Sequence, residues 1–229
     1  MQALAIIQAR MGSRRFPSKV LKEISGRPII SYVVKALECC DNISDIVVAT
    51  SKEEADQPIV DYCQENDIQF LRGSLNDVAQ RYRKAALQYG ISSFVRICAD
   101  SPLHDPATID KAIKTFFSKD YDLVTNTFPR TFPVGVSVEV VNAETYLSSA
   151  KLFVSEEHRE HVTRYFYDYP EKYKIFNLVF KPATPSMSFA VDSKEDFLLV
   201  TRIIESMDKP PWEYSIREKV KLYREHSER

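Results

Sequence analysis

The first half of the chain alternates short apolar segments with longer segments of helical periodicity, and this alternation limits the possible folds more than any other feature. Strands are predicted at residues 3–7, 45–49, 69–71, 94–98 and 122–125, and helices at residues 28–39, 55–65, 77–89 and 106–117. Strands that are separated by helices of about a dozen residues pair in parallel through right-handed crossovers. The sequence therefore predicts an α/β fold in three layers, with a mostly parallel sheet covered by helices on both faces.

The second half of the chain has a mixed pattern. Strands are predicted at residues 136–141, 176–180 and 189–191, and helices at residues 143–150, 155–169, 194–206 and 214–229. A chain of 229 residues has the size of one ordinary domain. We therefore predict a single domain over residues 1–229, with a small α+β subregion inserted at about residues 128–188 and a polar helical tail at residues 207–229, in which residues 219–229 form a solvated helix face.

A basic loop follows the first predicted strand. Between residues 8 and 19 it carries four cations, which are Arg10, Arg14, Arg15 and Lys19. Ligands of an open parallel sheet bind at the carboxyl ends of its strands, so Arg10 and Lys19 are predicted to neutralise phosphates there. Gly12 allows the backbone to approach a ligand closely. The loop matches neither the Walker nor the dinucleotide-binding pattern, and a solvated basic loop is the alternative.

Two aspartates follow predicted strands at other points of the chain. Asp100 comes after the strand at residues 94–98, and Asp192 after the strand at residues 189–191. Carboxylates at the ligand edge of the sheet suit Mg²⁺, which takes carboxylate and phosphate oxygens. The alternative for Asp192 is to cap the following helix, and Asp105, which precedes Pro106, is predicted to cap a helix rather than to bind a ligand.

Composition excludes several classes of protein. Lys and Arg number 31 and Asp and Glu number 32, and this balance argues against a dedicated nucleic-acid or membrane-surface protein. Four cysteines without a C-x-x-C pair indicate a thiol-reducing cytoplasm. The N-terminus lacks the pattern of a signal peptide, and no apolar run approaches the ~20 residues of a membrane span. We expect a cytoplasmic protein.

The motif Q-A-R-M-G-S-x-R-x-P-x-K at residues 8–19 resembles the opening signature of the cytidylyltransferases that make CMP-activated acidic sugars. This family includes the acylneuraminate and 3-deoxy-manno-octulosonate cytidylyltransferases, and the branch most similar to this chain is the spore-coat polysaccharide biosynthesis type. Further segments look like that branch, in the same order along the chain: residues 72–78, 100–103, 122–127, 159–163 and 191–196.

The resemblance implies a glycosyltransferase-A-like nucleotidyltransferase fold and the transfer of CMP from CTP to a sugar, with release of pyrophosphate and use of Mg²⁺. It implies an acidic 2-keto-3-deoxy sugar as acceptor, and a homodimer formed through residues 128–188. Arg10, Lys19 and Asp100 would be catalytic, and Asp100 and Asp192 would bind the metal. The nucleotide-binding positions would be Ala9, Arg10, Gly12, Ser13, Lys19, Arg72, Ser74 and Asp77, and the sugar-binding positions Asn126, Glu160 and His161.

Some features depart from the family pattern and leave other functions open. Many relatives have Gly where this chain has Ala99, and the longer acceptor-recognition segments of a sialic-acid enzyme are absent. A sugar-1-phosphate nucleotidyltransferase or a glycosyltransferase is one alternative, although Asp120 and Asp122 precede a predicted strand, whereas an Asp-x-Asp metal motif should follow one. A non-catalytic nucleotide-sugar binding protein is the other, and the presence of both Asp100 and Asp192 counts against it. The roles of Arg14 and Arg15 stay open.

Overall fold

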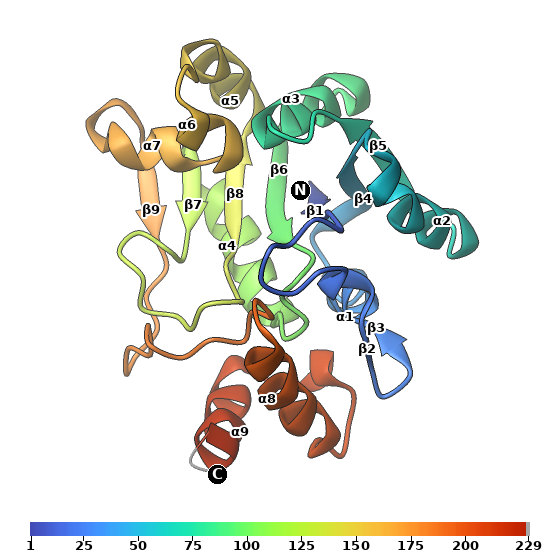
Figure 1. Cartoon of the computed structure of the whole chain (residues 1–229). Helices are drawn as coiled ribbons and strands as arrows, with labels where there is room; N and C mark the ends of the chain where they lie inside the picture. Colours follow the sequence, from blue (N-terminus) through green and yellow to red (C-terminus); the bar gives the residue numbers. More distant parts are fainter. Residues whose placement is uncertain (228–229) are drawn as a thin grey trace.

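The computed structural model describes residues 1–227. Its centre is a seven-stranded sheet, and Figure 1 shows the helices arranged around it. The strands lie in the order β5-β4-β1-β6-β8-β7-β9. Their bounds are β1 Ala3–Gln8, β4 Ile43–Ser51, β5 Gln69–Gly73, β6 Ser93–Cys98, β7 Leu123–Thr125, β8 Glu139–Asn142 and β9 Ile175–Asn177. Within residues 1–227, β8 alone runs against its neighbours in this sheet. The predicted fold class, a mostly parallel α/β sheet, is confirmed.

Helices cover both faces of the sheet. Alternate residues of a strand point to opposite sides, so a strand that is apolar throughout has an apolar surface to bury on each face. Ala5 and Ile7 of β1 join one apolar cluster, and Leu4 and Ile6 join the other. The first face is covered by α1 (Ile29–Glu38), α2 (Gln57–Glu65), α4 (Pro106–Ser118), α8 (Lys194–Glu205) and α9 (Ile216–Ser227). The second is covered by α3 (Val78–Tyr89), α5 (Ala143–Ser149), α6 (Glu156–Glu160) and α7 (Arg164–Asp168). Figure 1 shows α8 and α9 together at the opposite end of the molecule from α5 and α6.

Several helix ends agree with the sequence. The side chain of Asp77 accepts a hydrogen bond from the amide of Gln80 at the start of α3, and Gly90 ends α3 in the left-handed conformation. Asp105 caps α4 through the amide of Ala107, as predicted. In α8 the cap is Ser193, which forms a reciprocal capping box with Asp196. Asp192 is therefore not the cap of this helix, and the capping alternative is wrong.

Four predictions of secondary structure are wrong, and one of them is the strand expected at residues 176–180, which as β9 ends at Asn177. The helix expected at residues 155–169 is divided into α6 and α7, and the hydroxyl of Thr163, in the turn between them, donates to the buried carboxylate of Glu139 at 2.7 Å. The strand expected at residues 189–191 lies outside the sheet and is held by single backbone bonds to Val134 and Asp100. The strand expected from residue 136 begins only at Glu139. A two-stranded hairpin of β2 (Glu23–Ile24) and β3 (Arg27–Pro28) was not predicted.

The C-terminal tail packs against the domain, and the prediction of a solvated tail is wrong for α9. Ile216 and Val220 belong to the core, and Lys219 is fully buried. The Lys219 ammonium donates to the carbonyl of His104 at 2.8 Å. The last two residues of the predicted helix at 214–229 lie outside the described residues. None of the helices within residues 1–227 combines the length and the apolar character that crossing a membrane requires.

Lys219 is expected to make the stability of the protein rise with pH. Burial lowers the pKa of Lys219 from 10.5 to about 8. Between these values the unfolded chain binds a proton that the folded chain does not, so the free energy of unfolding increases with pH in that window. Relative to Lys219→Met, the wild type should gain roughly 2–3 kcal/mol between about pH 7 and about pH 10, measured by urea unfolding. A difference between the two proteins that stays constant over this range would contradict the buried charge.

Candidate functional site

A cleft of about 730 Å³ opens at the carboxyl ends of the central parallel strands. Its walls come from the ends of β1 and β6, from the basic loop, from the start of α3, and from the turn that separates α6 and α7. The lining residues are Gln8, Ala9, Arg10, Gly12, Ser13, Arg14, Arg15, Lys19, Val20, Leu75, Asn76, Val78, Arg81, Cys98, Asp100, Glu160, His161 and Asp192. The predicted position of the site, at the ligand edge of the sheet, agrees with this cleft.

The basic loop is anchored at its base by Asp56, which the sequence analysis missed. The carboxylate of Asp56 is buried and accepts from the amide of Met11 at 2.6 Å, while its second oxygen accepts from Ser51 at the end of β4. The carbonyl of Met11 in turn accepts from the amides of Ser13 and Ser18. Asp56 lies at the start of a predicted helix. Nothing in the sequence distinguishes a carboxylate that anchors a distant loop from an ordinary acidic residue in the first turn of a helix.

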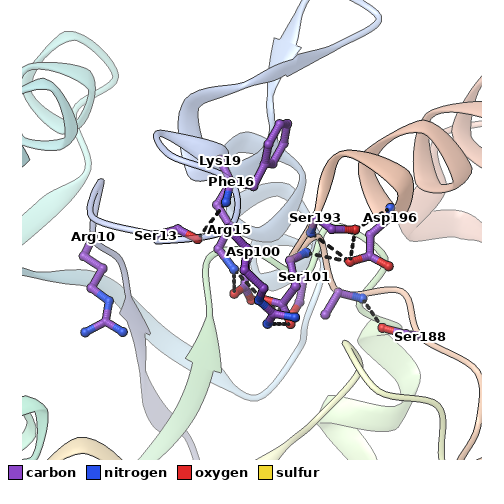
Figure 2. Close-up of polar contacts among 12 residues, drawn as sticks. Arg10, Ser13, Arg15, Phe16, Lys19, Asp100, Ser101, Ser188, Ser193 and Asp196 are labelled. Atoms are coloured by element: carbon purple, nitrogen blue, oxygen red, sulfur yellow. Dashed lines mark hydrogen bonds and ion pairs between the residues drawn. The ribbon is translucent and has the colours of Figure 1, made fainter.

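Lys19 lies between the two predicted metal-binding aspartates. Its ammonium donates to Asp100 at 2.6 Å and to Asp192 at 2.7 Å, and the guanidinium of Arg15 lies 3.2 Å from the other oxygen of Asp192. Figure 2 shows Lys19, Arg15 and Asp100 close together. Burial works against the charge on Lys19, but the two carboxylates outweigh it and raise the pKa of Lys19. Burial likewise opposes the charge on Asp192, and the hydrogen bond and charge of Lys19 outweigh it, so the pKa of Asp192 is lowered.

A close approach of two backbones brings Asp192 to Asp100. Gly135 has a φ of +84°, and a Cβ there would lie 2.3 Å from the amide nitrogen of Ala190. The amide of Phe189 donates to Val134, and the amide of Val191 donates to the carbonyl of Asp100 at 2.9 Å. Asp192 follows directly, so this backbone contact sets its position beside the end of β6.

The carboxylates of Asp100 and Asp192 fit the requirements of Mg²⁺. Both contribute hard oxygen donors to one cation position, which the Lys19 ammonium takes here. Within residues 1–227 no group of three or more His, Cys, Asp and Glu residues is arranged to hold a metal. Mg²⁺ is commonly bound by one or two carboxylates, with water and substrate phosphates completing its coordination. Two carboxylates beside a basic loop are such a donor set.

The turn between α6 and α7 faces the basic loop across the cleft. Glu160 forms an ion pair with Arg10 at 2.9 Å, and both side chains are partly exposed. His161 lies next to Glu160 and also lines the cleft. Figure 2 shows Arg10 set apart from the cluster of Lys19, Arg15 and Asp100. The cleft therefore has two polar regions, one around the aspartates and one around Arg10 and Glu160.

Four predicted site residues do not line the cleft. Arg72 donates to the carbonyls of Ser51 and Glu53 and to the side chain of Gln57, so its guanidinium is occupied by the protein. Ser74 and Asp77 hold the turn that leads into α3. Asn126 is fully buried, and its side chain bonds to the backbone of Val136 and Val138.

A buried ion pair supports the floor of the cleft and was also missed. Arg96 in β6 forms an ion pair with Glu139 in β8, and the same carboxylate accepts from the hydroxyls of Thr163 and Tyr167. Arg96 also donates to the side chain of Gln8, which lines the cleft. Burial favours the neutral form of Glu139, but the charge of Arg96 and these hydrogen bonds outweigh it and lower the pKa of Glu139. The sequence did contain a signal for this pair, since Arg96 is a charged residue inside the apolar strand predicted at residues 94–98.

Comparisons with known proteins give a consistent picture. A family model described as cytidylyltransferase matches residues 4–224. The chain is 31% identical to an uncharacterized protein of Methanocaldococcus jannaschii over the full length of both chains. It is 28% identical to the spore coat polysaccharide biosynthesis protein SpsF of Bacillus subtilis, over 91% of this chain and 88% of that one.

Among solved structures, a cytidylyltransferase from Leptospira borgpetersenii superposes with a TM-score of 0.93 at 26% identity, over 100% of this chain and 96% of that chain. A CMP:2-keto-3-deoxy-manno-octonic acid synthetase complexed with CTP has the same fold, with a TM-score of 0.69 at 14% identity over 90% of this chain and 99% of that chain.

Proposed function

Because this chain belongs to the cytidylyltransferase family, we propose that it transfers CMP from CTP to a sugar and releases pyrophosphate. The chain is a nucleotidyltransferase, as its family implies. The observation that carries the proposal is the meeting of Asp100 and Asp192 at Lys19, beside the basic loop. A pair of carboxylates next to several cations is the arrangement that a metal-bound triphosphate needs.

In the proposed reaction, a sugar hydroxyl attacks the α-phosphorus of CTP. The hydroxyl oxygen forms the new bond to phosphorus, the bond from phosphorus to the bridging oxygen of the β-phosphate breaks, and the hydroxyl proton passes to solvent. Arg10 and Lys19 would neutralise the triphosphate, and the backbone of Ala9, Gly12 and Ser13 would contact it. Catalysis of this kind rests on positioning and electrostatics, with no covalent intermediate.

Asp100 and Asp192 would hold Mg²⁺ in this proposal. When bound, Mg²⁺ would neutralise phosphate charge and lower the pKa of the attacking hydroxyl. Lys19 would then leave the two carboxylates and contact the phosphates. Arg15 is largely exposed and already lies 3.2 Å from Asp192. Its guanidinium would therefore be available to contact the same phosphates.

The sugar would lie near Glu160 and His161, because these residues line the side of the cleft that faces Arg10. Entry of the triphosphate would compete with Glu160 for Arg10 and so release the Glu160 carboxylate. Arg72, Ser74 and Asp77 would hold the cleft-lining residues Leu75, Asn76 and Val78 in place rather than touch the nucleotide. Asn126 would support the strand that carries Glu139.

The names of the relatives suggest which sugar and which pathway to test first. The spore coat protein acts in polysaccharide biosynthesis, and a 3-deoxy-manno-octulosonate cytidylyltransferase of Chlorobium chlorochromatii is 34% identical over 56% of this chain and 52% of that one. We therefore propose an acidic 2-keto-3-deoxy sugar as acceptor, for a cell-surface polysaccharide. We further propose a cytoplasmic homodimer that associates through about residues 128–188.

The proposal is tested by measuring pyrophosphate release with CTP, UTP, ATP and GTP, each with and without Mg²⁺. The acceptor panel contains 2-keto-3-deoxy acids, other acidic sugars and sugar 1-phosphates. Release that depends on CTP, Mg²⁺ and a free sugar supports the proposal. Release that requires a sugar 1-phosphate indicates the alternative nucleotidyltransferase, and nucleotide binding without release from any acceptor favours a binding protein.

Gly135→Ala is expected to lower the rate of pyrophosphate release by about 100-fold, since misplacing a reacting group by ~1 Å has an effect of that size. The added Cβ would lie 2.3 Å from the amide nitrogen of Ala190 and push away the backbone that carries Asp192. Gly26→Ala is the matched control, because Gly26 also has a positive φ but a Cβ there meets nothing within 4 Å. Equal losses in both variants would mean that backbone strain, and not the position of Asp192, causes the effect.

A further inference from the structure

Gln8 is the last residue of β1, and its side-chain amide is held in one orientation at the floor of the cleft. Nε of Arg96, on β6, donates to Oε1 of Gln8 at 3.1 Å, and the hydroxyl of Tyr82, on α3, lies 3.4 Å from the same oxygen. Nε of an arginine only donates, so the amide atom that faces it must be the oxygen. These neighbours therefore decide which end of the Gln8 amide is the nitrogen.

This orientation leaves the amide nitrogen of Gln8 for a ligand. Within residues 1–227 the side-chain hydrogen bonds of Gln8 are made through its oxygen, and Nε2 donates to none of these residues. Nε2 is also not among the side-chain atoms that are closed off from solvent without a partner in this part of the chain. Because Gln8 is only partly buried and lines the cleft, the two N–H groups of Nε2 are open to the cleft.

Gln8 lies between the two polar regions of the cleft. By the alternation of side chains along β1, Gln8 points to the face of the sheet that α3, α6 and α7 cover, on which the turn with Glu160 and His161 lies. On β6 it pairs with Cys98, two residues before Asp100. A group bound to Nε2 would therefore lie between the proposed metal site and the turn, where the acceptor sugar is proposed to bind.

The groups at this position suit a ligand group that only accepts hydrogen bonds. Nε2 carries two N–H donors and no free lone pair. The thiol of Cys98, the neighbouring residue on β6, keeps its proton at neutral pH, because burial raises the pKa of Cys98 to about 11. A sugar hydroxyl would find no strong acceptor for its own proton on these two groups. A carboxylate accepts and does not donate, so this part of the floor favours a carboxylate over a hydroxyl.

We propose that Nε2 of Gln8 donates to the carboxylate of the acceptor sugar and so selects acidic sugars over neutral ones. The inference rests on the proposed transfer of CMP to an acidic sugar, and it adds the residue that recognises the acid group. Arg96 and Tyr82 are positioning residues in this proposal, because they act on the sugar only through the orientation of the Gln8 amide.

Gln8→Glu is the test, because it keeps an oxygen for Arg96 and Tyr82 and replaces the two N–H donors by a negative charge. With CTP and Mg²⁺ saturating, the variant should raise the KM for a 2-keto-3-deoxy acid about 10- to 100-fold, the scale of a hydrogen bond to a charged group. The KM for the carboxamide of the same sugar should rise much less, since its N–H groups can donate to the new carboxylate. The KM for CTP should change little.

Two further variants separate recognition of the sugar from support of Arg96. Gln80→Glu is the matched control, because Gln80 is exposed on α3, accepts from the amide of Ser74 through its oxygen and does not line the cleft. Its KM values should equal those of the wild type. Gln8→Met removes the oxygen together with the donors. If Gln8 served only to hold Arg96, Gln8→Met would lower the melting temperature and the activity, whereas Gln8→Glu would keep the KM for the acid.

The outcomes separate this inference from the proposed function. A rise in KM for the acid that exceeds the rise for the carboxamide supports the inference. An unchanged KM for the acid, an equal rise for acid and carboxamide, or a matching rise in the KM for CTP overturns the inference and leaves cytidylyl transfer intact. A wild type that releases no pyrophosphate with any acidic sugar overturns both the inference and the proposed acceptor.

Discussion

Asp100→Asn is expected to lower the rate of CTP-dependent pyrophosphate release by roughly 10²–10³, because one preorganised charge contact in a transition state contributes about that factor. The substitution keeps the shape of the side chain and removes a negative charge from the proposed Mg²⁺ site. The fold should be little affected, since Lys19 keeps its contact with Asp192 at 2.7 Å and Asp192 keeps Arg15. Pyrophosphate release and thermal unfolding are measured on the same preparations.

Asp105→Asn is the matched control for this prediction. Asp105 follows the same strand, but it caps α4 and does not line the cleft. Asn is an equally good helix cap, so activity should stay close to that of the wild type. The dependence of the rate on Mg²⁺ concentration supplies a second measurement, and Asp100→Asn should need more Mg²⁺ for half-maximal activity. Near-wild-type release by Asp100→Asn at low Mg²⁺ would show that Asp100 does not bind the metal.

The proximity of Asp100 and Asp192 was predicted on the expectation that both residues follow parallel strands. Parallel strands end at the same edge of a sheet, which would bring the residues after them together. The strand predicted before Asp192 is not a strand, yet the backbone of residues 189–191 still reaches the end of β6 through the bond from Val191 to Asp100. The prediction of position was therefore less sensitive to error than the prediction of secondary structure.

Properties that depend on the partner of a single side chain could not be predicted. Arg72 looked like a ligand-binding cation, but three acceptors on β4 and α2 and in the segment between them occupy it. Arg81 lies in a polar helical segment, and nothing in the sequence distinguishes it from Arg83, although one is buried in the cleft and the other pairs with Asp77. The turn that divides the helix expected at residues 155–169 carries Thr163, whose hydroxyl donates to Glu139 on a distant strand. Helical periodicity carries no information about such contacts.

Glu139→Gln is expected to have the largest effect on stability. Glu139 is 2% exposed, and its carboxylate is the counter-charge of the Arg96 guanidinium, whose side chain is 15% exposed. Removing one partner of a buried pair typically lowers the free energy of unfolding by about 3–5 kcal/mol, because the other charge stays buried and uncompensated. For a chain of this size each kcal/mol corresponds to a loss of roughly 2–4 °C in the melting temperature. Urea and thermal unfolding of the purified variant measure the effect.

Two further variants separate the charge from the hydrogen bonds. Thr163→Val removes one hydrogen bond to Glu139 and should lower the free energy of unfolding by only about 1 kcal/mol. Replacing both charges, as in Arg96→Met/Glu139→Leu, should recover much of the stability lost in Glu139→Gln, because two apolar side chains leave no buried charge unpaired. The double variant should still have lower activity, since Gln8 loses its contact with Arg96 and Thr163 no longer holds the turn that carries Glu160 and His161. If Glu139→Gln were no less stable than Thr163→Val, the Arg96–Glu139 pair would act as an ordinary polar contact, and the turn would depend on the hydrogen bonds alone.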